Sequence, residues 1–173
     1  KRGFKSWLAF LMSICIASGK TAALLKPSGV HPVLFIEEEG ARKPTARRFR
    51  WLEKAHGIDI AKDCEGRFWW AHRQHVLLDD SKWISRIASE IRDKGIRLVV
   101  VDTLAKASSA EENSATDISH LMRSIDRLRD AGASVVYLHH LKRYHKDAST
   151  DVDEELRGSS ALEGYYDVHI AVR

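Results

Sequence analysis

The sequence predicts an α/β fold in which a mainly parallel sheet is covered by helices on both faces. Short apolar runs rich in β-branched and aromatic residues alternate along the chain with longer amphipathic segments, an order typical of parallel sheets. Polar residues follow several of these runs, at the strand ends where such sheets bind ligands. With 173 residues, 44% of them apolar, we expect one domain over residues 1–173 with a substantial core.

Five apolar runs are predicted as strands. Each is short and is bounded by proline, glycine or charged residues. They lie at 33–36, 67–74, 96–102 and 134–140, with a last strand that follows a short turn or helix in the segment 157–173. The run that ends at Asp102 is apolar throughout, as in a strand buried on both faces.

Four segments are predicted as helices. Residues 5–18 are apolar on all sides, which predicts a buried helix, and Gly19 is suited to end it. The other three segments are amphipathic and lie at 43–57, 80–94 and 116–132.

The first 20 residues allow two interpretations. Basic residues, an apolar run and small residues follow one another, as in a secretory signal peptide. The run from Trp7 to Ala17 is shorter than the roughly 18–20 apolar residues of a membrane span. Because the predicted sheet needs this segment as a helix beside its strand ends, we favour the buried helix.

Lys5-Ser6 begins this helix, as at the end of the phosphate-binding pattern G-x-x-x-x-G-K-[ST]. In that pattern Lys5 neutralises phosphate charge, Ser6 binds Mg²⁺, and backbone amides of the helix start face the phosphates. Gly3 and Trp7 flank the pair, and Phe4 stands where the second glycine belongs. We expect backbone strain at Phe4 unless Gly3 absorbs the turn.

The first glycine of this pattern would precede residue 1, and the sequence has no initiator methionine. We therefore expect an N-terminally truncated fragment that lacks the first strand and the start of the phosphate-binding loop. The net charge of +4 permits a nucleic-acid partner without requiring one. The two cysteines, Cys15 and Cys64, form no disulfide or metal framework, which fits a reducing cytoplasm.

Acidic residues end two of the predicted strands. Asp102 follows four apolar residues, and in nucleotide sites an acid in this place holds Mg²⁺. Glu39 follows the strand at 33–36 and is a candidate base that orients the attacking water. The three glutamates 37–39 are equally compatible with a solvated strand end. Because parallel strands end at one edge, we expect these acids and His139-His140 to lie together beside Lys5-Ser6.

The chain resembles the RecA-like P-loop ATPase core of RepA-like hexameric plasmid-replication helicases, a group close to DnaB-type helicases and KaiC-like ATPases. The matching segments occur in family order over nearly the whole chain. They are KSWLAFLMSICIASG, VLFIEEEGARKPTARRFRWL, LVVVDTLAKA, VVYLHHLKR and RGSSAL. The resemblance implies ATP and Mg²⁺ as cofactors, with Glu39 as the catalytic glutamate. It also implies His140 as a γ-phosphate sensor beside His139, and Arg157 as a finger reaching a neighbouring subunit.

The resemblance further implies a ring, expected as a hexamer, with single-stranded DNA bound by the polar loops 105–115 and 141–156 in its channel. The cations of these loops are Lys106, Lys142, Arg143 and Lys146. A basic stripe at helical spacing, Lys43, Arg47, Arg50 and Lys54, is better interpreted as a solvated face or subunit contact than as a DNA contact. The Trp69-Trp70 pair is better interpreted as strand packing than as a base-stacking platform.

We therefore expect a cytoplasmic, non-membrane ATPase motor core acting on single-stranded DNA, as in a replicative helicase of a plasmid, phage or mobile element. Two alternatives stay open. Phe4 in the phosphate loop favours a nucleotide-binding regulatory module with weakened hydrolysis, whereas Glu39 argues against it. A RecA-like recombination ATPase would share the fold and form filaments instead of rings.

Overall fold

The computed structural model describes residues 4–111, 114–139, 162, 165–170 and 172. Four parallel strands form a sheet in the order β2-β1-β3-β4: β1 (Val33–Glu37), β2 (Phe68–His72), β3 (Leu98–Asp102) and β4 (Ser134–Tyr137). Its helices are α1 (Lys5–Ser18), α2 (Arg42–His56), α3 (Ile60–Asp63), α4 (Ser81–Lys94) and α5 (Ala115–Asp130), with a 3-10 turn, η1 (Leu104–Lys106), after β3. The expected α/β fold with a parallel sheet is confirmed.

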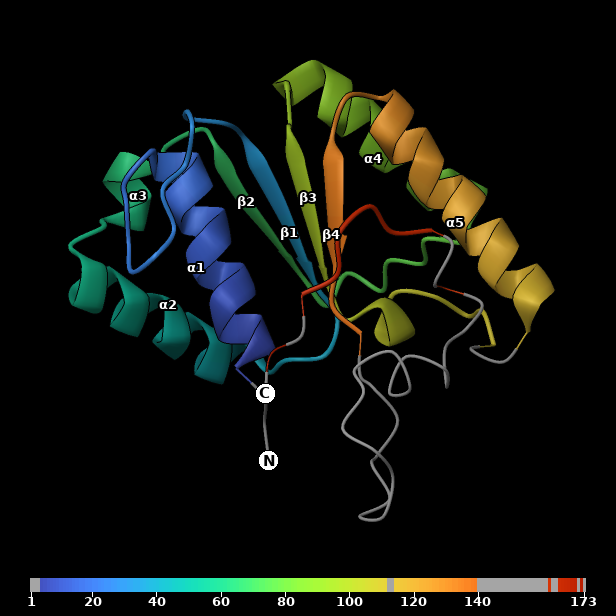
Figure 1. Cartoon of the computed structure of the whole chain (residues 1–173), viewed down its shortest axis with the longest axis horizontal. Helices are drawn as coiled ribbons and strands as arrows, with labels where there is room; N and C mark the ends of the chain where they lie inside the picture. The colour runs from blue at the N-terminus through green and yellow to red at the C-terminus, as the bar shows by residue number, and fades with distance from the viewer. Residues whose placement is uncertain (1–3, 112–113, 140–161, 163–164, 171, 173) are drawn as a thin grey trace, which may run out of the picture.

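The helices cover both faces of the sheet, with α1, α2 and α3 on one side and α4 and α5 on the other (Figure 1). Alternate residues of β3 serve the two layers. Val99 and Val101 pack in the cluster of α4 and α5, whereas Leu98 and Val100 pack in the cluster of α1 and α2. Because both faces are covered, all five residues of β3 are buried, as the apolar run predicts.

The predicted last strand is wrong for the residues that the structure describes. Residues 165–170 and 172 have no strand conformation, and within the described chain no strand pairs with the outer edge of β4. Val168 and Ile170 are accordingly 77% and 67% exposed. Apolar sequence favours a strand only where a neighbouring strand supplies hydrogen bonds. The sequence reasoning also missed α3, which is one turn long.

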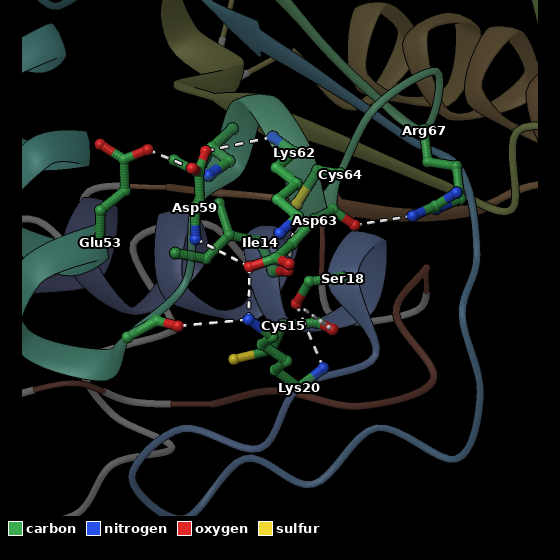
Figure 2. A network of polar contacts seen from close by, with 12 residues as sticks. Ile14, Cys15, Ser18, Lys20, Glu53, Asp59, Lys62, Asp63, Cys64 and Arg67 are labelled. Atoms are coloured by element: carbon green, nitrogen blue, oxygen red, sulfur yellow. Dashed lines mark hydrogen bonds and ion pairs between the residues drawn. The ribbon is translucent and has the colours of Figure 1, made fainter.

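The C-terminal end of α1 is fixed to α3 and the segment after it (Figure 2). Gly19 ends α1 in the left-handed conformation, as the sequence predicts, with φ of 75°. The Lys20 ammonium group binds the Asp63 carboxylate and donates to Gly57 O at 3.2 Å. Arg67 Nε donates to Ala17 O at 3.0 Å. These contacts fix α1 at one end and so position its other end, which carries Lys5.

The sequence predicts that Cys15 and Cys64 form no disulfide framework and that the first helix is too short to span a membrane. Both cysteines are free and buried, consistent with the absence of a disulfide framework. Among the helices that the structure describes, none is both long enough and apolar enough to cross a membrane.

Candidate active site

Two carboxylates end the central strands on the same face of the sheet. Glu37 is the last residue of β1 and pairs with Asp102, the last residue of β3. Side chains alternate along a strand, so Glu37 shares the face of Phe35, and Asp102 shares the face of Val100. Phe35 and Val100 both pack in the α1 cluster. Strand parity therefore directs both carboxyl groups to the side on which α1 begins.

Lys5, in the first turn of α1, reaches across these strand ends. Its Nζ donates to His139 O at 2.6 Å, just beyond β4. Burial lowers the pKa of Lys5, and the nearby carboxylates of Asp102 and Glu39 oppose that effect. The ammonium group thus lies within the electrostatic reach of two acids that the sequence assigns to nucleotide chemistry.

Glu37 is held from three directions in the interior. Thr45 Oγ1 donates to Glu37 Oε1 at 2.7 Å, and Trp70 Nε1 donates to Glu37 Oε2 at 3.0 Å. His72 Nδ1 lies 3.7 Å from Oε2. Burial raises the pKa of Glu37, the hydrogen bonds from Thr45 and Trp70 partly offset the rise, and Asp102 adds to it. Glu37 is 1% exposed, so this carboxyl group is shut away from bulk water.

The next two glutamates have different environments. Glu38 accepts hydrogen bonds from the backbone amides of His75 and Val76, both at 3.1 Å, and so ties β1 to the segment after β2. Glu39 is exposed and lines the same cavity as Lys5. Of the three, Glu39 is the glutamate that is exposed and also lines this cavity, a position that a base for a water molecule requires. Its catalytic role stays a prediction.

The N-terminal end of α1 is suited to an anion. Phe4 occupies the N-cap position without a capping side chain, and the first turn carries no acidic residue. The first amides of a helix point outward without partners inside the helix, so an uncapped start attracts negative charge. Phe4 has φ of −74° and is 69% exposed. The backbone strain expected at Phe4 is therefore absent, because its φ lies outside the left-handed region.

One cavity of about 2010 Å³ brings most of the predicted site together. Its lining includes the predicted residues Lys5, Ser6, Trp7, Glu39, Asp102 and His139. The expectation that these groups meet at one edge of the sheet is confirmed for the described residues. Gly3, His140, Arg157 and the whole loop 141–156 lie outside the described residues, as do 112–113 of the loop 105–115.

The donor set at this edge fits a nucleotide with Mg²⁺. Ser6 and Asp102 supply the hard oxygen ligands that Mg²⁺ prefers, and Lys5 with the open start of α1 supplies positive charge for phosphates. A Mg²⁺ ion held by these residues would supply positive charge that neutralises the phosphates. No cluster of three histidine, cysteine or acidic ligands occurs in the described part of the chain, so a zinc centre is not supported there.

Sequence reasoning missed two residues of this site. Glu37 was not separated from its two neighbours, although its place two residues after Phe35 signals an inward direction. Arg48 lines the cavity from α2, with its guanidinium 5.9 Å from the centre of the Trp7 ring. No local pattern identifies Arg48, because its position depends on how α2 packs against α1.

The role of Trp69 and Trp70 is settled by packing. Trp69 packs against the cluster of α4 and α5, and Trp70 against the cluster of α1 and α2. The prediction that they pack within the fold is confirmed, and the Nε1 of Trp70 is engaged by Glu37.

Comparison with known proteins gives one family. Residues 1–145 match the model of the AAA domain family designated AAA_25, which is of the P-loop ATPase type. No curated protein matches the chain. The family match covers the first helix, all four strands and the two acidic strand ends described above.

Proposed function

The chain belongs to the AAA domain family, and from this premise we propose that it is an ATP-hydrolysing motor core acting on single-stranded DNA. The proposed context is a replicative helicase of a plasmid, phage or mobile element that assembles into a ring. One observation carries the ATPase part: Lys5, Glu39 and Asp102 converge on one cavity at the strand ends. The DNA part is supported by the resemblance described above.

Each residue has a distinct part in this proposal. Lys5 and the first amides of α1 hold the phosphates, and Ser6 and Asp102 hold Mg²⁺. Glu39 accepts a proton from the attacking water. Glu37 is 1% exposed and is engaged by Thr45 and Trp70, so we do not assign it this role. The regulatory alternative rests on Phe4 in place of the second glycine, and Phe4 has φ of −74°, outside the left-handed region.

Nucleotide binding tests the phosphate site directly. We expect Lys5→Ala to abolish MgATP binding in calorimetry, since it removes a cation that interacts electrostatically with Asp102 and Glu39 at the predicted phosphate site. The matched control is Lys26→Ala, the same substitution at an exposed lysine that does not line the cavity, which should bind normally. Unchanged affinity of the Lys5 variant would refute the assignment.

Turnover distinguishes the glutamates. Glu39→Gln should keep ATP binding and lose turnover by about 10²-fold or more, the size of a general-base contribution. Glu37→Gln is the control, because an amide can still donate to Thr45 Oγ1 and accept from Trp70 Nε1. If Glu37→Gln stops turnover and Glu39→Gln does not, the base has been placed on the wrong glutamate.

Unwinding tests the motor. With ATP, the intact protein should hydrolyse faster in the presence of single-stranded DNA and should separate a strand from a tailed duplex. Lys106→Ala should weaken this stimulation without changing ATP affinity, because Lys106 lies in η1 and outside the residues that line the cavity. If single-stranded DNA does not change the rate of ATP turnover, the ATPase assignment stands, but the proposal that the protein is a DNA motor is refuted.

A further inference from the structure

Helix α2 concentrates positive charge. It carries six cationic side chains and a single carboxylate; the cations are Arg42, Lys43, Arg47, Arg48, Arg50 and Lys54. The carboxylate, Glu53, accepts a hydrogen bond from Ile60 N at 3.0 Å and so serves the start of α3. In the part of the chain that the structure describes, no ion pair involves an α2 cation. The residues that the structure describes therefore do not neutralise the positive charge of α2 through ion pairs.

Two tryptophans extend this helix into a stacked array. Trp7 from α1 and Trp51 from α2 lie parallel, with an angle of 4° between their planes and 5.8 Å between ring centres. The guanidinium carbon of Arg47 lies 5.8 Å from the centre of the Trp51 ring. Arg48 lies over Trp7 in the same way. A cationic group over the face of an indole ring is attracted to that ring, and these attractions hold the array in place.

The core does not require Trp51. The residues with which α2 packs against the sheet are Thr45, Phe49 and Leu52, on the opposite side of the helix. Trp51 is 54% exposed. Positions 47, 50, 51 and 54 are three or four residues apart, so Trp51 lies beside Arg47, Arg50 and Lys54 on the outer face. A large flat ring, contacted by Trp7 and Arg47 and still about half exposed, therefore lies in the middle of a basic surface.

We propose that this face of α2, centred on Trp51, binds single-stranded nucleic acid by stacking an unpaired base on the Trp51 ring. The cations beside Trp51 contact the phosphates on either side of that base. A basic groove with aromatic side chains is how proteins hold single strands without sequence preference. Duplexes fit less well, because their bases are already stacked on each other. An acidic protein could pair with the cations of this surface, but it would have no base to stack on the Trp51 ring.

This proposal extends the proposed function and rests on it for a nucleic-acid substrate, but it concerns a different surface. The loops 105–115 and 141–156 were expected to contact DNA, and the basic stripe of α2 was expected to be solvated or to contact a subunit. No pattern in the sequence joins the stripe to Trp7, which is 44 residues from Trp51 along the chain. The stack becomes visible only when α1 and α2 pack together.

The test is binding of a fluorescein-labelled oligothymidylate to the intact protein, followed by anisotropy over a range of salt. Trp51→Ala should weaken affinity about tenfold, since stacking on an aromatic ring contributes about that much per base. Trp51→Phe should recover most of the loss, because the phenyl ring still stacks. Replacing Arg50 and Lys54 by glutamine should lower the salt slope by about 0.7 per phosphate contact.

The matched control is Trp83→Ala on α4. Trp83 also lies under an arginine, with Arg86 5.5 Å from its ring centre, but on the other side of the sheet. Equal losses for Trp51→Ala and Trp83→Ala, or no loss for Trp51→Ala, would overturn the proposal. So would a change of assembly state by sedimentation with unchanged oligonucleotide affinity, because the face would then contact another subunit.

ATP affinity, measured on the same variants, separates this proposal from the proposed function. Trp51 does not line the cavity that holds Lys5, so Trp51→Ala should bind MgATP normally. If Lys5→Ala does not change ATP affinity, the proposed nucleotide site is refuted. The oligonucleotide measurements on the Trp51 variants would still test the nucleic-acid surface on their own. Because Trp51 is mostly exposed, its variants should fold, and circular dichroism verifies this.

Discussion

Gly40 leaves space for the buried Glu37 carboxylate, and a methyl group at Gly40 should remove that space. A β-carbon there would overlap the carboxylate, lying 2.8 Å from Glu37 Cδ and 2.9 Å from Thr45 Oγ1. Gly40 is not among the glycines with positive φ, so the cost comes from space and not from backbone conformation. The carboxylate can move only by losing the hydrogen bonds from Thr45 and Trp70.

Overpacking and the loss of such bonds each cost about 1–3 kcal/mol, so we expect Gly40→Ala to lower the free energy of unfolding by about 2–4 kcal/mol. Glu39 precedes Gly40 directly, and a displacement of about 1 Å at a catalytic group can cost 10²-fold in rate. Urea unfolding and ATP turnover measure the two effects.

A double-mutant cycle with Glu37→Ala identifies the cause. In the Glu37→Ala background, the added methyl group no longer meets the Glu37 carboxylate, which supplies its two nearest atoms, so Gly40→Ala should cost at least about 1 kcal/mol less than in the natural sequence. The control is Gly29→Ala, whose methyl group would lie 2.9 Å from Nε2 of the exposed His31 ring. That ring can rotate away, so the cost should stay within about 0.5 kcal/mol. Additive costs for Glu37→Ala and Gly40→Ala would refute the reasoning.

Three further predictions concern the ends of α1 and a buried thiol. Burial raises the pKa of Cys64 to about 11, so its alkylation should be slow at neutral pH and accelerate as the pH approaches that value; fast reaction at pH 7 would contradict its burial. Phe4→Gly should change ATP affinity by less than about tenfold in calorimetry, because Phe4 has an ordinary φ and an exposed ring. Lys20→Met should lower stability slightly at neutral pH. The Lys20 ammonium group depresses the pKa of Asp63 below its ordinary 3.8, so the difference from the natural chain should disappear as the pH falls through that range.

The local patterns of the sequence were sufficient for the sheet and for much of the site edge. The run before Asp102 is apolar because β3 is buried on both faces, and Lys5-Ser6 begins a helix that Gly19 ends. The last strand was misjudged because an apolar run at 165–172 does not reveal whether a neighbouring strand is present to pair with it. Alternation places Glu37 on the inward face of Phe35 but gives Glu39 the same parity, so only the end of β1 at Glu37 separates the buried glutamate from the exposed one.

The contacts of α2 could not be predicted in the same way. Arg48 and Trp51 reach Trp7 through packing between two helices that are separated by β1 in the chain. Periodicity indicates which side of a helix faces the core, but it does not specify which residues of another helix the remaining side chains meet. The basic stripe was therefore visible in the sequence, whereas its aromatic partner was not.

The relative position of Lys5 and Glu39 depends on the α1–α2 layer as well as on the sheet. Lys5 is carried by α1, whose far end is fixed through Lys20 to Asp63. Glu39 lies in the turn that leads into α2, and Thr45 of α2 fixes that turn by its bond to Glu37. Because Arg48 of α2 packs on the Trp7 ring of α1, the two helices also contact each other beside the cavity. Lys5 on α1 and Glu39 in the turn before α2 therefore keep a defined separation through the contact between these two helices as well as through the strand ends, where Lys5 Nζ donates to His139 O and Glu38 N donates to Asp102 O.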